Sequence, residues 1–148
     1  MLLGRIIRNE RTNEFAAPRF VRTIGTHHDV VTCIAMCSDD ERVISASLDR
    51  IVKIWSATTG QALGSIRLGR DCWPCIALFP DGKRAVVGSS FSHDVLYVFR
   101  IDDGAVLQAF RSWPHMESVL SVVVSRNNRR IASTSQDKSI EIWNVRSG

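Results

Sequence analysis

Two groups of residues along this chain combine a histidine, a serine and an aspartate, the three side chains of a nucleophilic triad. Every member of the second group lies 88 residues after its counterpart in the first. The groups are His27, Ser45 and Asp49, and His115, Ser133 and Asp137. In a hydrolase, the histidine takes the proton of the serine hydroxyl while the aspartate orients the histidine. The same side chains also form buried structural networks, so the elements that carry them decide between the two interpretations.

The position of each serine favours a structural network over a hydrolase triad. A nucleophilic serine must be exposed beside an oxyanion-stabilising pocket, often on a strained turn. Ser45 and Ser133 instead fall inside predicted strands, and each is followed ten residues later by a tryptophan, Trp55 or Trp143. The aspartate can accept the imidazole N–H, the other ring nitrogen can accept the serine hydroxyl, and the serine oxygen can accept the indole N–H. We therefore predict no catalytic residues and a non-enzymatic protein.

Short apolar and β-branched runs separated by turn residues predict strands along most of the chain. They cover 19–24, 30–36, 42–47, 51–55, 61–67, 75–79, 84–89, 95–99, 105–111, 119–124, 130–135 and 139–145. The run 30–36 is almost continuously apolar, which predicts burial on both of its faces. In the middle of the chain, Val87 and Phe99 occupy the places of the serine and the tryptophan. We therefore expect the polar network to be lost there.

A repeat of 88 residues is twice 44, and four-stranded propeller blades recur at roughly 40–45 residues. With two His…Ser-x-Ser-x-Asp-x5-Trp segments and glycine-closed turns, the chain resembles the tryptophan-aspartate (WD) repeats of β-propellers. The resemblance implies an all-β fold of about three four-stranded antiparallel blades in an incomplete ring. It also implies two hydrogen-bonded sets, His27, Ser45, Asp49 and Trp55, and His115, Ser133, Asp137 and Trp143.

The expected organisation is a poorly ordered extension over residues 1–18 and a propeller segment over residues 19–148. Within that segment we expect a fourth-type strand at 19–24, a blade at 25–67, a degenerate blade at 68–111, and a last blade at 112–148 without its fourth strand.

Three blades do not close a ring, because propellers typically have at least four. One hypothesis is that two chains join head to tail, with the strand at 19–24 of each chain completing the last blade of the other. The other hypothesis is that the chain is the N-terminal piece of a longer propeller protein, which in isolation exposes edge strands at both ends.

In this family, the loops that lead into the blades and the turns between second and third strands form a common docking surface. The matching candidates for partner binding are His28, Val30, Leu48, Trp73, Met116, Ser118 and Gln136. Buried aromatic and large apolar anchors carry much of the energy of an interface. An alternative for Trp73 and Met116 is that they pack against neighbouring blades.

The composition is that of an ordinary globular protein, with 45% hydrophobic and 23% charged residues among 148 and a net charge of +4. No apolar run approaches the ~20 residues needed to cross a bilayer, so no membrane contact is expected. The main expectation is a scaffold for protein partners. Because most of the cations are arginines, docking of RNA or a ribonucleoprotein is the alternative, although the arginines are scattered rather than gathered in one run.

Four cysteines could pair or bind metal, but their surroundings favour buried thiols. Cys72 and Cys75 have a Cys-x-x-Cys spacing without a second such pair or a predicted helix beside them. Cys75 also aligns with Cys33, at an apolar strand position. The absence of a recognisable secretory leader predicts a reducing compartment, cytoplasmic or nuclear. No metal and no cofactor are expected.

Overall fold

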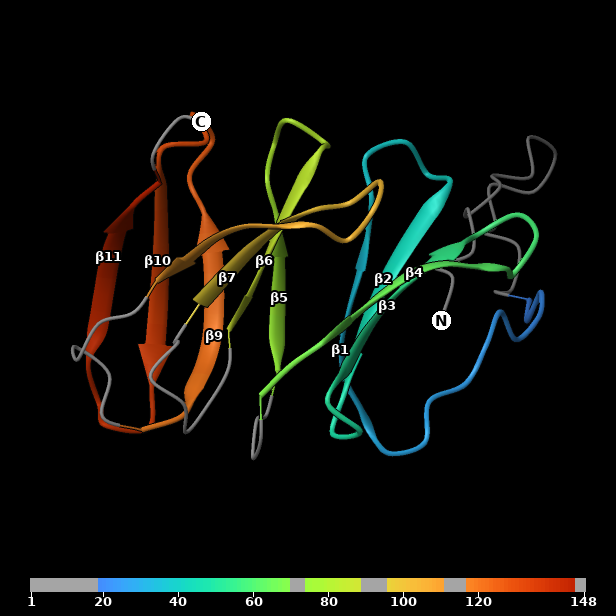
Figure 1. Ribbon diagram of the computed structural model, residues 1–148, viewed down its shortest axis with the longest axis horizontal. Coiled ribbons are helices and arrows are strands. Elements are labelled where there is room, and N and C mark those ends of the chain that lie inside the picture. The colour runs from blue at the N-terminus through green and yellow to red at the C-terminus, as the bar shows by residue number, and fades with distance from the viewer. Residues whose placement is uncertain (1–18, 70–73, 89–95, 111–116, 146–148) are drawn as a thin grey trace, which may run out of the picture.

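The computed structural model describes residues 19–69, 74–88, 96–110 and 117–145, which form three antiparallel β-sheets (Figure 1). The first sheet holds β1 (Val31–Met36), β2 (Arg42–Ser47), β3 (Ile51–Ser56) and β4 (Ala62–Arg67). The second holds β5 (Cys75–Leu78), β6 (Arg84–Gly88), β7 (Leu96–Arg100) and β8 (Val106–Phe110). The third holds β9 (Val119–Val124), β10 (Arg130–Ser135) and β11 (Ile140–Asn144).

Strands that follow one another in the chain are neighbours in each sheet, which is the meander of a propeller blade. The predicted all-β fold with blades in an open ring is therefore confirmed. The described part of the third blade has three strands, with β11 at its edge. The parts of the chain that the structure describes contain no helix able to span a membrane.

The three blades share one register as well as one strand order. In each blade an aromatic residue of the third strand pairs with an apolar residue of the second. The equivalent pairs are Val43 with Trp55, Ala85 with Phe99, and Ile131 with Trp143. The structure thus confirms that Phe99 occupies the position of the tryptophan.

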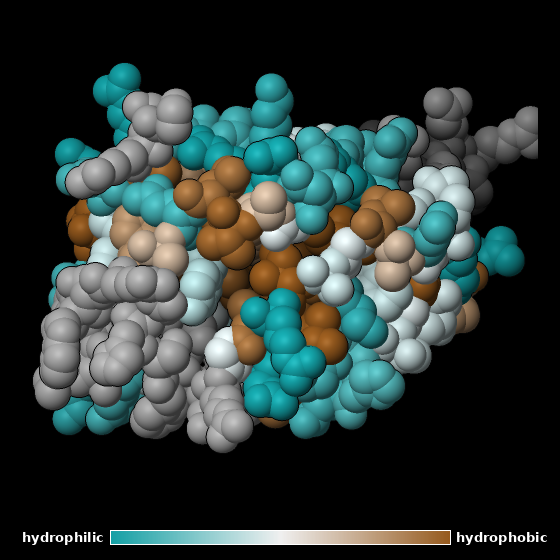
Figure 2. All heavy atoms as spheres, in the orientation of Figure 1, coloured by the Kyte–Doolittle hydropathy of each residue, from teal (hydrophilic) through white to brown (hydrophobic). Residues whose placement is uncertain are grey.

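The hydrophobic core lies between the blades rather than within one of them. Side chains from one face of the first blade meet the facing side of the second, and the second meets the third in the same way. The first of these cores includes Ile44, Val52, Ile54, Val87 and Phe99, and the second includes Val86, Val98, Val119, Ile131 and Trp143. Figure 2 shows hydrophobic residues gathered in the middle of the face in view, with hydrophilic ones along its borders.

Residues 19–24 do not form the strand predicted for them, since the first strand of the structure is β1. The fourth strand of a blade forms its hydrogen bonds with the third strand of that blade. No described strand lies beside residues 19–24 to act as such a third strand. The segment instead contacts the first blade, where the Arg22 guanidinium donates to the carbonyl oxygen of Ala57. Gly25, which follows, lies directly against the ring of Trp55.

The prediction that the first strand is buried on both faces was wrong. In β1, Cys33 and Ala35 pack toward the second blade, whereas Ile34 is 49% and Met36 38% exposed. The strand is apolar on both faces, but among the described residues only the second blade packs against the first, on one side.

Candidate functional site

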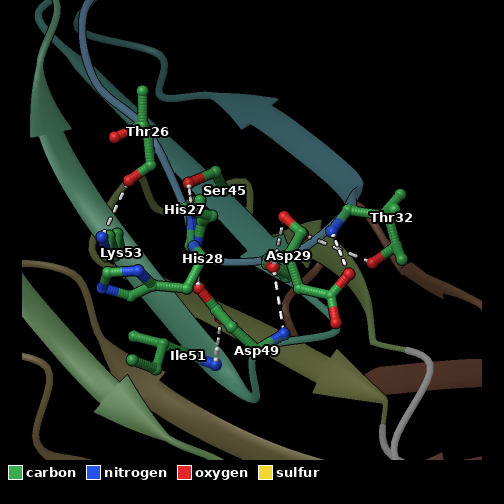
Figure 3. A network of polar contacts seen from close by, with 12 residues as sticks. Thr26, His27, His28, Asp29, Thr32, Ser45, Asp49, Ile51 and Lys53 are labelled. Carbon is green, nitrogen blue, oxygen red and sulfur yellow. Dashed lines mark hydrogen bonds and ion pairs between the residues drawn. The ribbon is translucent and has the colours of Figure 1, made fainter.

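The first blade brings together the four residues of its expected network, His27, Ser45, Asp49 and Trp55. The His27 Nδ1 lies 2.9 Å from Asp49 Oδ2, and Nε2 lies 2.7 Å from Ser45 Oγ. The indole Nε1 of Trp55 donates to the same serine oxygen at 2.7 Å. Figure 3 shows the histidine between the serine and the aspartate. With the proton on Nδ1, the imidazole ring donates to the carboxylate and accepts the serine hydroxyl. Both ring nitrogens, the serine hydroxyl and the indole N–H then each take part in a hydrogen bond.

Asp49 also fixes the backbone on both sides of the network. Its Oδ2 accepts the amide of His28 and its Oδ1 accepts the amide of Ile51, each at 2.9 Å. Burial by itself raises the pKa of the Asp49 carboxyl. The hydrogen bonds from His28, His27 and Ile51 outweigh burial and hold this pKa at about 2. The carboxylate therefore ties the loop before β1 to the turn before β3.

We expect this carboxylate to make the fold sensitive to acid. Because the folded-state pKa of Asp49 is about 2, below its ordinary value of 3.8, its contribution to stability is complete above pH ~4 and is lost as the pH falls toward about 2. Urea unfolding of the parent and of Asp49→Asn across this window measures it. The parent should lose about 2 kcal/mol more than the variant. Equal losses in the two proteins would contradict the assignment.

Asp39 and Asp81 also lose stabilising interactions in acid, and they do so equally in the parent and in Asp49→Asn. Burial raises the pKa of each carboxyl, but backbone amides and an arginine, Arg42 or Arg84, outweigh it and lower the pKa below its ordinary value. Their acid sensitivity is the same in the parent and in Asp49→Asn, so it cancels in the difference between them.

A second serine, which the sequence reasoning did not single out, holds the same loop. Ser47 is fully buried, donates its hydroxyl to the Asp29 carbonyl oxygen at 3.1 Å, and accepts the Asp49 amide at 3.1 Å. Leu48 then donates its amide to the Val30 carbonyl oxygen at 3.0 Å. The sequence did contain a signal for this role, because a second serine recurs in each Ser-x-Ser pair. The turn that follows places Arg50 at a φ of 69°.

The third blade repeats this turn closely. Ser135 donates to the Glu117 carbonyl oxygen and accepts the Asp137 amide, both at 3.2 Å, and Asp137 accepts the Ser139 amide at 2.8 Å. Trp143 Nε1 donates to Ser133 Oγ at 2.8 Å. His115, the remaining member of this expected set, lies outside the described residues.

The middle blade has apolar residues where its neighbours have the network. Val87 and Phe99 are both fully buried, at the positions of Ser45 and Trp55 in the shared register. The side chains of valine and phenylalanine have no hydrogen-bonding atoms, so the packing of apolar side chains replaces the serine–tryptophan bond here.

The candidate partner-binding residues differ in how far they reach the surface. His28 and Gln136 are exposed, Val30 is 59% exposed, and Leu48 is half-buried. Ser118 is buried, with 6% exposure, and its carbonyl oxygen accepts the Gln136 amide at 3.0 Å. The backbone of Ser118 thus anchors the turn at Gln136, and its contact with a partner stays a prediction. Trp73 and Met116 lie outside the described residues.

Three cysteines of the described chain, Cys33, Cys37 and Cys75, are free thiols. Burial raises the pKa of Cys75 to about 12 and that of Cys37 to about 11. Such thiols stay protonated near neutral pH, which is the opposite of a reactive cysteine. Cys72 lies outside the described residues. Within the described ranges no three histidine, cysteine, aspartate or glutamate side chains gather as a metal site.

A family model described as "WD domain, G-beta repeat" matches residues 18–56 and 107–144, about half of the chain. The chain therefore belongs to the WD40 repeat family. The two matched segments contain both Ser-x-Ser-x-Asp turns and the tryptophan that follows each of them, Trp55 or Trp143, and the degenerate middle blade lies largely between the segments.

Among curated proteins, the chain is similar to pre-mRNA-processing factor 17 of Homo sapiens and of Mus musculus. Each is 29% identical to it over 126 residues, 84% of this chain. Two solved structures, entitled "Structure of U3-55K" and "Crystal structure of RRP9 WD40 repeats", match 84% of the chain with a TM-score of 0.73, at 25% and 26% identity. The chain spans 21% of the curated relatives and 38% of the solved chains.

Proposed function

We propose that this chain is a non-enzymatic interaction scaffold that presents the surface between its blade-leading loop and its β2–β3 turn to a protein partner. The observation that carries the proposal is that one carboxylate, that of Asp49, bonds the ring of His27 and the amide of His28 together. The exposed side chains of His28 and Val30 thus stand on a backbone that is already held in place. A preorganised surface loses less conformational freedom on binding.

The burial of the network supports a role in structure rather than in catalysis. The Ser45 residue is only 5% exposed, and its oxygen is already engaged by His27 and by Trp55. A nucleophile must reach its substrate and must sit beside donors for the oxyanion. A serine inside β2, bonded on both sides, meets neither requirement.

The relatives support placing this scaffold in RNA processing. The curated proteins it matches are named as pre-mRNA-processing factors. This name favours a protein partner within an RNA-processing assembly and a nuclear location over the cytoplasmic one.

Direct docking of RNA is the second candidate, and the third blade supplies an observation that favours it. The turn between β9 and β10 carries the exposed Arg126 and Arg129, and the exposed Arg130 begins β10. Guanidinium groups bind phosphate through paired hydrogen bonds and release counterions, which gives an affinity that falls steeply with salt.

Capture from a nuclear extract distinguishes the two functions. The immobilised chain should retain a protein partner after nuclease treatment and at raised salt, and Val30→Glu should reduce that capture about tenfold, because it places a charge in a desolvated contact. Leu63→Glu is the matched control, since Leu63 is 47% exposed on β4, away from the loop. Its capture should equal that of the parent.

The opposite pattern would assign the chain to RNA. In that case nuclease or salt abolishes capture, Val30→Glu captures normally, and a double variant Arg126→Glu, Arg129→Glu captures nothing. This result would overturn the protein-scaffold proposal.

A further inference from the structure

The turn that follows the first strand of each blade has the same backbone hydrogen bonds in all three blades. The amides of Cys37, Phe79 and Ser125 each donate to the carbonyl oxygen of the arginine five residues later, at 2.9 Å. These three residues therefore hold equivalent positions in the first, second and third blades. The described chain thus contains two junctions between neighbouring blades, one before and one after the second blade, built from equivalent residues.

A phenylalanine fills the second junction, between the second and third blades. The Phe79 side chain is 2% exposed and belongs to the core that includes Val145 of the third blade. The guanidinium of Arg84 lies over its ring, 4.3 Å from the centroid. Across the junction, the side-chain oxygen of Asn128 accepts the amide of Asp81 at 3.2 Å. The turns of the two blades are thus joined, with an aromatic ring packed beside them.

The first junction, between the first and second blades, has smaller residues at both of these positions. Cys37 stands where the second junction has Phe79. Gly82, at a φ of 68°, stands where the third blade has Asn128, at a φ of 61°. Gly82 has no side chain to reach the neighbouring turn, and a Cβ there would lie 2.7 Å from Oγ of Ser38. The first junction therefore lacks both the aromatic ring and the side-chain amide.

A pocket of about 230 Å³ lies at the first junction. It opens beside the β1–β2 and β5–β6 turns, which Figure 1 shows next to each other. Its lining includes Cys37 of the first blade and Leu78 and Ile101 of the second. An apolar cavity of about 150 Å³ holds benzene in another protein. The pocket is therefore large enough for an aromatic ring.

The turns around this pocket hold more acid than base. They contain six carboxylates and four cations, and they cover residues 38–42, 80–84 and 100–104. Three of the cations are arginines that pair with carboxylates of the same turns, which leaves Lys83. Asp40 and Glu41 are exposed and form no ion pair within the described chain. Because the turn 125–130 of the third blade has three arginines and no acid, the acidic surface is local to the pocket.

We propose that this pocket is a second docking site, which takes an aromatic side chain from a basic segment of a protein partner. The ring packs against Cys37 and Ile101, and the lysines or arginines beside it face Asp40 and Glu41. Burial of the ring supplies affinity, and the acidic turns favour a basic segment over an acidic one. The site lies at the opposite end of the strands from the surface proposed for the scaffold and shares no residue with it. Either proposal can therefore fail without the other.

Fluorescence anisotropy with the full 148-residue chain tests the pocket. The probe is a dye-labelled peptide with one phenylalanine between two flanks of three lysines. Cys37→Phe should weaken its binding at least about tenfold, because the new ring fills the pocket as Phe79 fills the next junction. Cys37→Ala is the matched control, since it leaves the pocket open, and it should bind the probe as the parent does. Circular dichroism of both variants should equal that of the parent.

Two further comparisons test the chemistry of the partner and do not depend on the folding of Cys37→Phe. A peptide with alanine in place of the phenylalanine, and one with glutamate flanks, should each bind at least about tenfold more weakly than the probe. The double variant Asp40→Lys, Glu41→Lys alters two exposed residues and should weaken binding several-fold, with a smaller salt dependence than that of the parent. Glu117→Lys, an exposed site on the loop before β9, should bind as the parent does.

Four results would overturn the proposal. The probe fails to bind at concentrations up to the millimolar range, or the alanine peptide binds as well as the probe. A folded Cys37→Phe variant binds like the parent, which excludes the pocket as the site of the ring. Equal binding of the lysine-flanked and glutamate-flanked peptides excludes a basic partner segment.

Discussion

Replacing Asp49 by alanine should lower the free energy of unfolding by about 3 kcal/mol. The carboxylate accepts three hydrogen bonds of 2.9 Å, from the His27 ring and from the amides of His28 and Ile51. Its side chain is only 6% exposed, so the donors left behind are not all reached by water. A buried donor without an acceptor costs about 1–3 kcal/mol. The Asp49 carboxylate is the acceptor for three such donors.

Chemical denaturation of parent and variant measures this loss. The matched control is Glu41→Ala, which removes an exposed carboxylate from the turn between β1 and β2 and should change stability by no more than about 0.5 kcal/mol. Far-UV circular dichroism should show the same strands in all three proteins. Equal stability of Asp49→Ala and the parent would show that the network does not hold the blade.

Replacing Gly25 by alanine should destabilise the fold by about 3 kcal/mol, through crowding rather than through lost bonds. A methyl group at Gly25 would lie 2.2 Å from Cζ3 and 2.4 Å from Cη2 of Trp55. The ring has little room to move, because it is 8% exposed and its Nε1 is bonded to Ser45. The Lys53 ammonium also lies over the ring, 5.2 Å from its centroid, and donates to the Thr26 carbonyl oxygen at 2.9 Å.

Gly64→Ala is the matched control for this prediction. A methyl group there would meet only the Cδ1 of Ile54 at 3.6 Å, an ordinary contact. Because glycine inside a strand costs about 0.5–1 kcal/mol relative to alanine, the control should be neutral or slightly more stable than the parent. Similar thermal midpoints for the two alanine variants would contradict the crowding argument.

Much of the fold can be predicted from the sequence because the signals repeat. The recurrence of the Ser-x-Ser-x-Asp turn and the tryptophan 88 residues later predicted equivalent blades, and the strands of the structure end within a residue or two of those predicted. Phe99 could be placed because register follows from spacing once the repeat is known. The residue types of the network were likewise available, since hydrogen-bonding capacity is a property of each side chain.

Other features could not be predicted, because they depend on what lies beside each element. The strand β1 is apolar on both faces, yet half of it is exposed, since the described residues place a blade against only one of those faces. Residues 19–24 have the composition of a strand, but a strand also needs a neighbour, and the described chain offers none. Ser118 matches a surface position by alignment and is nevertheless buried, because its loop folds onto the turn at Gln136.

The sequence by itself thus determined the repeat, the strand order within each blade and the residues of the His27 network, because these follow from local pattern and from the chemistry of side chains. Only the tertiary structure decided which faces are covered. It placed Val52 and Ile54 in a core and left their counterparts Ile140 and Ile142 in solvent. The physical reason is that an apolar side chain becomes buried only where another element arrives to cover it.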